Sequence, residues 1–391
     1  MKWEKVKLSE VTEYITDGDH QPAPKSDSGV LFVKIKDIQD NRLTFDNALF
    51  VPQEYYNRLP KNRKAEYGDT LYTVVGSYGI PAFVNHNIPF CFERNIALLH
   101  PNNRVIPKYL YYAVNNPIFY GNANNIANGS AQKLIPLSKL AGMEISVPPI
   151  ERQETIVNIL SAYDDLIENN QKQIKLLEEA AQRLYKEWFI DLRFPGHETT
   201  PIVDGIPEGW EIQTLSQIAD VVMGQSPKSE FYNQDRQGLP FHQGVGSYGT
   251  RFVIDTTYST SFTRIAEAGS ILFSVRAPVG RLNITKNKIV IGRGLAAINH
   301  RSGMQSYLFY LLKERFFKDN IIGNGAIFAS ISKDELLGQK FIVSVDDLVK
   351  RFNTVVSDID GKIAGLENQI MLLTEARDRL LPKLMSGEIE V

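Results

Sequence analysis

The sequence contains one cysteine, Cys91, among its 391 residues. A single cysteine excludes an internal disulfide and is typical of proteins that fold in a reducing cytoplasm. Long apolar runs are also missing, because none reaches the roughly 18 residues that a membrane-spanning helix needs. Residues 1–10 are charged, unlike a signal peptide. We therefore expect a cytoplasmic protein without a membrane span.

The short motifs of common catalytic and cofactor sites are absent as well. The sequence has no Gly-x4-Gly-Lys-Ser/Thr phosphate loop, no Cys-x-x-Cys and no His-Glu-x-x-His. Adenine methyltransferases hold a flipped base with an Asn-Pro-Pro-aromatic run, and Asn116-Pro117-Ile118-Phe119 lacks its second proline. We therefore expect no catalytic residue, metal or cofactor in this chain, and we favour a binding function over catalysis.

The composition is that of an ordinary globular protein. Hydrophobic residues make up 43% and charged residues 23% of a chain long enough for two or three domains. The net charge is −2, which argues against a protein that coats nucleic acid without sequence preference.

Apolar residues spaced alternately by four and three run from Pro148 to about Phe189. This heptad pattern predicts one long helix, the first rod, and a seam this narrow needs a partner helix to bury it. The predicted seam residues of the first rod are Ile156, Leu160, Tyr163, Ile167, Asn170, Ile174, Leu177 and Leu184.

The pattern returns 196 residues later, where eleven of twenty-four positions between 161–184 and 357–380 are identical. Such identity indicates an internal duplication, so the partner helix is expected in the same chain. The predicted seam residues of the second rod are Phe352, Val356, Ile359, Ile363, Leu366, Ile370, Leu373 and Leu380.

The residues outside the rods form two similar blocks. Trp210, Leu215 and Ile218 stand 207 positions after Trp3, Leu8 and Val11. We predict an α/β protein with two similar α+β domains, separated by two long helices that form an antiparallel coiled coil. The expected parts are a first domain (1–147), a first rod (148–190), a linker (191–209), a second domain (210–343), and a second rod with a C-terminal tail (344–391).

Within the first domain, residues 30–38, 70–75, 88–99 and 143–147 are predicted strands, because apolar residues dominate or alternate there. Residues 107–114 are a predicted helix, and its tyrosines Tyr109, Tyr111 and Tyr112 are expected to pack inside. Residues 118–135, crowded with Asn, Gly and Ser, are a predicted loop.

Several stretches together resemble one protein family. They are Pro148-Pro149-Ile150-Glu151-Arg152-Gln153, Gly205-Ile206-Pro207-Glu208-Gly209-Trp210, Leu380-Leu381-Pro382-Lys383-Leu384-Met385-Ser386-Gly387-Glu388, and the loops Asp17-Gly18-Asp19-His20, Gly76-Ser77-Tyr78-Gly79 and Asn128-Gly129-Ser130-Ala131-Gln132-Lys133. In order and duplication they resemble the specificity subunits of type I restriction-modification systems, over nearly the whole chain.

The resemblance implies a subunit without activity of its own that selects double-stranded DNA for others. It implies two methyltransferase subunits, which use S-adenosylmethionine and grip the rods, and restriction subunits, which use ATP and Mg. Each domain would read half of a bipartite site in the major groove, with the spacer set by the coil. Because the loops of the two domains differ, the half-sites should differ too.

Base reading requires Arg or Lys for guanine and Asn or Gln for adenine on protruding loops, while other residues touch phosphate. The candidates in the first domain are Gly18, His20, Gln21, Lys34, Lys36, Ser77, Tyr78, Arg94, Ser130, Gln132 and Lys133. Those in the second domain are Gln225, Ser226, Lys228, His242, Gln243, Ser247, Tyr248, Arg276, Arg281, Arg293, Asn324 and Ser330.

Alternatives remain open on the residues alone. The twin domains could join protein partners with no role on DNA, and the coil could serve stability alone. Asn170 and Arg377, two polar residues at apolar seam positions, are either tolerated or fix the register of the helix pair.

Overall fold

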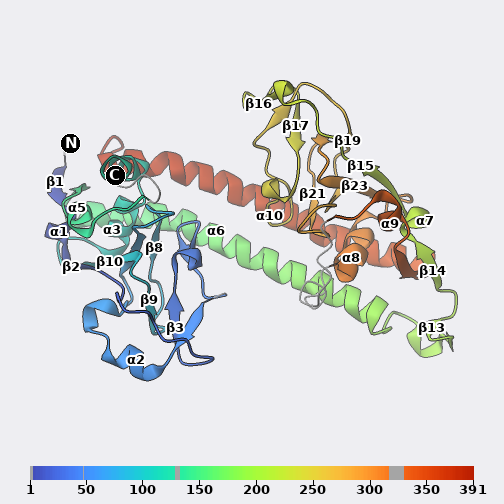
Figure 1. The fold of residues 1–391 in the computed structure, drawn as a ribbon, viewed down its shortest axis with the longest axis horizontal. Coiled ribbons are helices and arrows are strands. Elements are labelled where there is room, and N and C mark those ends of the chain that lie inside the picture. Colours follow the sequence, from blue (N-terminus) through green and yellow to red (C-terminus); the bar gives the residue numbers. More distant parts are fainter. Residues whose placement is uncertain (1–2, 47, 128–132, 317–329) are drawn as a thin grey trace. The chain divides into compact units, whose positions relative to one another are not determined.

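The computed structural model describes residues 3–46, 48–127, 133–316 and 330–391. The chain divides into two compact units (Figure 1). The first unit comprises Met1–Gln171 and Asn368–Val391, and the second comprises Lys172–Glu367. Each unit therefore contains one globular domain together with a part of each long helix.

The two rods are the helices α6 (Ile150–Tyr185) and α10 (Asp346–Ser386). α6 begins directly after the Pro148-Pro149 pair and continues through one π-helical turn, Lys186–Ile190. Its 36 residues span about 54 Å at 1.5 Å per residue. Each helix is too long for one domain to cover its whole apolar seam, and each helix passes through both units.

The helices pack antiparallel in both units. In the first unit Ile156 and Leu160 of α6 share a core with Leu384 of α10. In the second unit Tyr185 of α6 lies against Phe352 of α10, with ring centroids 5.7 Å apart. The start of α6 thus packs against the end of α10, and the end of α6 packs against the start of α10, as predicted for the duplicated heptads.

The predicted seam faces inward along both helices. Its buried members are Ile156, Leu160, Ile167, Asn170, Ile174, Phe352, Val356, Ile363 and Leu366, and its half-buried members are Tyr163, Leu177, Leu184, Ile359, Ile370, Leu373 and Leu380. The polar seam residues have partners in the first unit. Asn170 Nδ2 donates to Gln369 Oε1 at 3.2 Å, and Arg377 Nη1 donates to Asp164 Oδ1 at 2.7 Å.

The first domain is built from small sheets. β1 (Glu4–Lys7) pairs with β11 (Glu144–Val147), and a four-stranded sheet has the order β2 (Thr12–Asp17), β10 (Ile96–Pro101), β7 (Thr70–Thr73) and β8 (Pro81–Phe83). A further sheet has the order β6 (Leu49–Val51), β3 (Val30–Val33) and β9 (Phe90–Phe92), in which β3 and β9 are parallel. The hairpin β4 (Ile38–Gln39) and β5 (Arg42–Leu43) follows β3.

The described residues of this domain also form five α-helices: α1 (Leu8–Val11), α2 (Gln53–Arg58), α3 (Pro107–Val114), α4 (Pro117–Ile126) and α5 (Leu137–Ala141). α3 has the predicted bounds, and its three tyrosines are buried in the core that this domain shares with α6 and α10. Tyr112 donates its hydroxyl hydrogen to Asp164 Oδ2 at 2.6 Å, which joins the domain to α6.

The second domain repeats this plan. β14 (Glu211–Thr214) pairs with β24 (Lys340–Val343), and the four-stranded sheet has the order β15 (Ala219–Met223), β23 (Leu295–His300), β20 (Ile271–Ser274) and β21 (Leu282–Ile284). The other sheet has the order β16 (Tyr232–Asn233), β18 (Tyr258–Ser259), β17 (Leu239–His242), β22 (Ile289–Ile291) and β19 (Ile265–Ala266), with β17 and β22 parallel.

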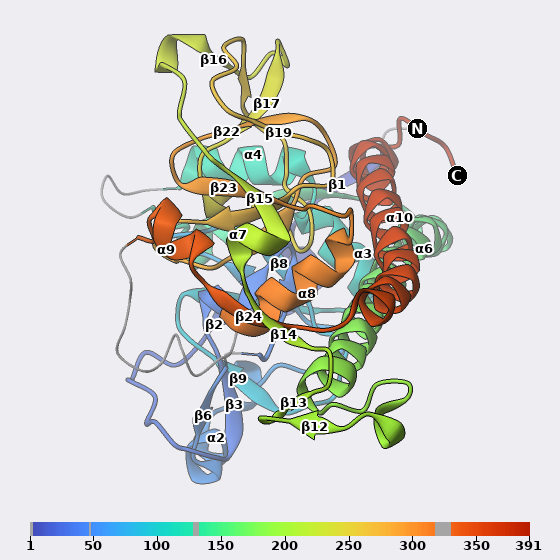
Figure 2. The same ribbon diagram turned by 90° about the vertical axis from the view of Figure 1, so that its right-hand side faces the viewer.

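The helices of the second domain are α7 (Leu215–Ile218), α8 (Gln305–Phe316) and α9 (Lys333–Leu337). Figure 2 shows α8 beside α10, and Tyr307 and Tyr310 of α8 enter the same core as Phe352 of α10. Each domain is therefore anchored on the helix pair by the helix that follows its four-stranded sheet.

Three local predictions differ from the structure. The predicted strand 30–38 ends at Val33 and continues as the 3-10 turn Ile35–Asp37, and the predicted strand 88–99 is two strands separated by a turn at Glu93, Arg94 and Asn95. The predicted loop 118–135 begins with the helix α4, because Asn116 caps it by accepting from the backbone N–H of Ile118 at 3.0 Å. In the linker, Ile202–Val203 and Ile206–Pro207 form the hairpin β12–β13.

Candidate nucleic-acid interface

One edge of the first domain gathers polar side chains from segments far apart in the sequence. β3 and β9 are parallel, so their carboxyl ends lie at the same edge. Lys34 follows β3, and Arg94 stands in the turn after β9. The loop that follows β2 joins them, because Asp19 forms a parallel bridge with Glu93. The topology therefore places two cations and one polar loop together.

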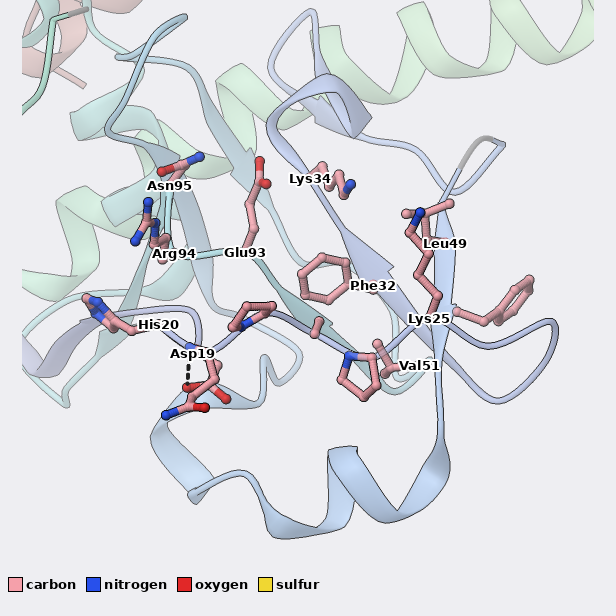
Figure 3. Close-up of a pocket in the computed structure, with 15 residues that line it drawn as sticks. Asp19, His20, Lys25, Phe32, Lys34, Leu49, Val51, Glu93, Arg94 and Asn95 are labelled. Atoms are coloured by element: carbon pink, nitrogen blue, oxygen red, sulfur yellow. Dashed lines mark hydrogen bonds between the residues drawn. The ribbon is translucent and has the colours of Figure 1, made fainter.

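These segments surround a cavity of about 340 Å³ (Figure 3). Its lining includes four of the predicted contact residues, His20, Gln21, Lys34 and Arg94. Figure 3 shows Glu93 between Arg94 and Lys34. The Glu93 carboxylate accepts from the backbone N–H of Ile35 at 2.8 Å, which fixes the bend after β3.

The loop beside this cavity is fastened by Asp19. Its carboxylate accepts from Arg63 Nη1 and from the Tyr55 hydroxyl, each at 3.0 Å. Burial, followed by the hydrogen bond to Asp19, raises the pKa of Tyr55 well above its usual value, so the hydroxyl remains a donor. His20, in contrast, is exposed and hydrogen-bonds to Asp17 with its Nε2 at 3.0 Å from Oδ2.

The second domain forms the same edge with different side chains. β17 and β22 are parallel, and Gln243 and Arg293 occupy the places that Lys34 and Arg94 hold in the first domain. A cavity of about 190 Å³ is lined by Gln243, Arg293 and Arg276, the last from the turn between β20 and β21. Ser226 Oγ accepts from the backbone N–H of Arg293 at 3.2 Å.

Two glycines show how closely the polar loop approaches the turn in each domain. A Cβ on Gly18 would lie 2.0 Å from the carbonyl oxygen of Phe92, and one on Gly224 would lie 2.1 Å from that of Gly292. Gly18 is buried, so it contributes to the edge by close packing.

We expect Gly18→Ala to disrupt the edge of the first domain and Gly224→Ala that of the second, each at a cost of about 1–3 kcal/mol, because backbone must move to admit the methyl group. Hydrogen exchange of peptides from each edge would measure this loss of protection. Gly121→Ala and Gly361→Ala are matched controls, since a Cβ there meets nothing within 4 Å. Equal protection in all four variants would contradict the prediction.

Other predicted residues of the first domain lie on an adjoining turn. The backbone N–H of Val74 donates to the carbonyl of Asn95 at 2.9 Å, which places the β7–β8 turn beside the cavity. Ser77 and Lys133 are exposed there, and Lys133 Nζ lies 3.4 Å from the half-buried Tyr78 hydroxyl. Lys36 is exposed on the 3-10 turn. Ser130 and Gln132 lie outside the described residues.

Two predicted contact residues of the second domain are turned inward. His242 is 1% exposed. Its Nδ1 lies 2.8 Å from Ser247 Oγ, and its Nε2 lies 2.9 Å from Asp255 Oδ1. The half-buried Tyr248 packs against a small core of this domain, and burial raises the pKa of its hydroxyl. Both residues pack within the second domain, where His242 holds the segment after β17 through Ser247 and Asp255.

The Asp255 carboxylate supports this arrangement in its charged form. Burial alone would raise its pKa, but hydrogen bonds from His242 and Asn287 outweigh burial and hold the pKa below its usual value. A charged carboxylate is a strong acceptor for the ring of His242.

The remaining described candidates of the second domain do not line the cavity. Gln225 is exposed, and Lys228 is exposed with its Nζ 3.8 Å from Glu230 Oε1. Arg281 is half-buried at the end of the β20–β21 turn, where its backbone N–H donates to Ser274 Oγ at 2.8 Å. Ser330 is exposed and forms a bridge with Arg276. Asn324 lies outside the described residues.

Sequence reasoning missed some residues of these surfaces. Asn124 of α4 accepts from Lys133 Nζ at 3.1 Å, and Tyr120 of α4 stacks on Tyr78 with ring centroids 6.2 Å apart. Both belong to the segment that was predicted as a loop. Lys25 and Asn95 line the first cavity, and nothing in their sequence pattern distinguishes them from other loop residues.

The described residues contain no group of three or more His, Cys, Asp or Glu side chains that could hold a metal ion. No helix within the described ranges is both long enough and apolar enough to cross a membrane. Burial raises the pKa of the Cys91 thiol to about 12, so this cysteine is a small core residue.

Comparison with known proteins agrees with this architecture. The chain matches the family model of the type I restriction modification DNA specificity domain over residues 1–179 and 207–346. It is 30% identical over 409 residues to the MjaX type I restriction enzyme specificity subunit of Methanocaldococcus jannaschii, with 100% of this chain and 94% of that protein covered. It is 22% identical over 442 residues to the HindI specificity subunit of Haemophilus influenzae, with 92% and 94% covered.

Among solved structures, the S subunit of a type I restriction-modification system from M. genitalium has the same fold. The TM-score is 0.60 at 16% sequence identity, and the superposition covers 98% of this chain and 96% of that one.

Two α+β domains, each packed on a part of both long helices, are the architecture shared with this family of solved structures. The chain belongs to the type I restriction-modification DNA specificity family. It is the DNA specificity subunit of a type I restriction-modification complex.

Proposed function

We propose that each domain reads one half of an asymmetric bipartite site on double-stranded DNA through the edge described above. The main support is that both domains form the same edge with different side chains. Lys34 in the first domain corresponds to Gln243 in the second, while Arg94 and Arg293 correspond to each other. Lysine and arginine pair with guanine and glutamine with adenine, so the two edges suit different base sequences.

The proposal is tested by selecting bound sequences from random duplexes with the chain assembled with its methyltransferase subunits. We expect one motif with two unlike half-sites at a fixed spacing. Equal protection of unrelated duplexes would contradict the proposal, and protection of no duplex would favour a twin-domain adaptor. Mapping of methylated positions in cells with and without this chain would then identify the site.

We also propose that the outer faces of α6 and α10 bind two methyltransferase subunits, which carry S-adenosylmethionine, and that restriction subunits with ATP and Mg join that assembly. Seam burial occupies one face of each helix, yet large apolar side chains are exposed elsewhere on both. Leu176 of α6 is 64% exposed and Leu372 of α10 is 53% exposed. They stand 196 residues apart and are thus the same position of the duplicated rods. Such repeated exposed leucines favour two equivalent docking surfaces.

We expect Leu176→Glu and Leu372→Glu each to weaken the binding of one methyltransferase copy about tenfold or more, because a charge would enter an apolar contact. Native mass spectrometry of the purified complex would then show one copy in place of two. Ile212→Glu is the matched control, since Ile212 is 63% exposed on β14 of the second domain and belongs to neither helix. Retention of two copies by both leucine variants would rule out these surfaces.

A further inference from the structure

Arg251 is the largest fully buried side chain of the chain's described residues, with 2% exposure. It lies on the segment between β17 and β18 of the second domain, yet its guanidinium contacts both long helices within the second unit. Nη2 lies 2.5 Å from Asp360 Oδ1 of α10, and Nη1 lies 3.8 Å from Glu178 Oε1 of α6. The guanidinium carbon lies 3.6 Å from the ring centroid of Phe309.

The backbone of Arg251 is fastened at the same place. Its N–H donates to Glu367 Oε1 at 3.2 Å. Its carbonyl accepts from the backbone N–H of Ile284 at 3.0 Å, and Val253 N–H donates to the carbonyl of Ile284 at 3.0 Å. Ile284 ends β21, the strand that follows the turn with Arg276. One residue thus ties α6, α10 and a strand of the recognition domain together.

The segment that carries Arg251 also builds the cavity. Gln243 stands at its start and lines the cavity with Arg276 and Arg293. The backbone N–H of Ile254 donates to the carbonyl of Ser247 at 2.9 Å, and the buried His242 contacts Ser247, so the segment is held as one folded loop. A shift at Arg251 would therefore move Gln243.

The first domain has a similar but weaker contact between the segment after its first parallel strand and α6. The hairpin β4–β5 follows β3 as the Arg251 segment follows β17, and its Arg42 hydrogen-bonds to Gln171 of α6. The carbonyl of Asn41 accepts from the Tyr111 hydroxyl at 3.3 Å. Both domains thus extend the segment after their first parallel strand to α6, which argues for a positioning role rather than an accident of packing.

We propose that Arg251 is a positioning residue that orients the second reading edge on the helix pair, so that it determines discrimination in the second half-site. Burial of an ion pair gives little net stability, since desolvation of the charges offsets their attraction, but it fixes geometry strictly. Burial, the largest influence, raises the pKa of Asp360, while Arg251 acts in the opposite direction. The inference rests on the proposed bipartite reading.

The test uses the complex purified on a tag attached to this chain, and a duplex site selected from random DNA. Affinities are measured for that duplex and for duplexes with one changed base pair in either half-site. For each half-site, the discrimination ratio is the affinity for the selected duplex divided by the affinity for the duplex changed in that half-site. We expect Arg251→Ala to lower the second-half ratio about tenfold or more and to leave the first-half ratio unchanged. We expect Arg251→Lys to restore the second ratio partly, because it keeps the charge but loses the planar stacking on Phe309.

The matched control is Arg377→Lys, which alters the partly buried arginine of the first unit that pairs with Asp164 and should leave the second-half ratio unchanged. If Arg251 serves stability alone, its variants lower the active fraction and leave both ratios unmoved, which overturns the inference, as does an equal fall in both ratios. Should Arg251→Ala fail to fold, Arg251→Lys decides by the same ratios. A wild-type complex that discriminates in neither or only one half-site would instead disprove the bipartite reading.

Discussion

Phe352→Ala is expected to lower the free energy of unfolding of the second unit by about 3–5 kcal/mol. The Phe352 ring is fully buried and lies where α10 meets the domain and α6. Its centroid is 5.2 Å from that of Phe189, 5.7 Å from that of Tyr185 and 6.2 Å from that of Tyr307. Removing the ring would leave a cavity among rigid aromatic neighbours, which cannot collapse into it easily.

Hydrogen exchange resolved by peptide would measure this effect, because the chain has two units and a single unfolding transition cannot be assumed. Protection in α8 and the first turns of α10 should fall most. Val355→Ala is the control on the same helix, since Val355 is 48% exposed and its truncation should change stability by less than about 0.5 kcal/mol. Unchanged protection in Phe352→Ala would contradict the role assigned to this ring.

The rods were the part of the fold most accessible from sequence. A heptad states which side chains face inward, and the duplication identified the partner helix, so the packed pair of α6 and α10 followed from the residues alone. The heptad pattern does not predict which residues outside the helix pair cover a seam residue. Phe352 was predicted as a seam position, but its contacts with Tyr307 and Tyr310 of the domain depend on where α8 lies.

The errors in the predicted strands and loops arose because each segment was interpreted from its own composition alone. The asparagines of residues 117–126 suggested a loop, yet the cap at Asn116 and the proline at the first helical position start a helix. Arg94 and Arg293 were predicted as contact residues because cations on turns stand out. Their common position at the ends of parallel strands could not be predicted, because strand direction is set by tertiary pairing. The burial of His242, whose ring nitrogens face Ser247 and Asp255, likewise leaves no local pattern in the sequence.

Arg94→Ala and Arg293→Ala are expected to weaken binding of the selected duplex by about 1–3 kcal/mol each, which is the discrimination of a bidentate contact with guanine. Each variant should also lose preference at one base pair in its own half-site only. Competition binding with every single-base variant of the selected duplex measures both effects. Arg104→Ala and Arg301→Ala are matched controls, because these exposed arginines follow the other ends of β10 and β23 and pair with Glu4 and Asp220.

Salt dependence separates the two roles that an arginine at this edge can have. If Arg293 contacted only phosphate, its removal would weaken all duplexes equally and reduce the slope of log K against log salt by about 0.9. A contact with a base edge instead changes the ranking of duplexes and leaves most of that slope in place. Arg94 and Arg293 occupy the same place in the duplicated edge. We therefore expect both variants to change the ranking of duplexes and to keep most of the salt slope. A uniform loss in both would place these arginines on the DNA backbone and move base reading to Lys34, Gln243 and Arg276.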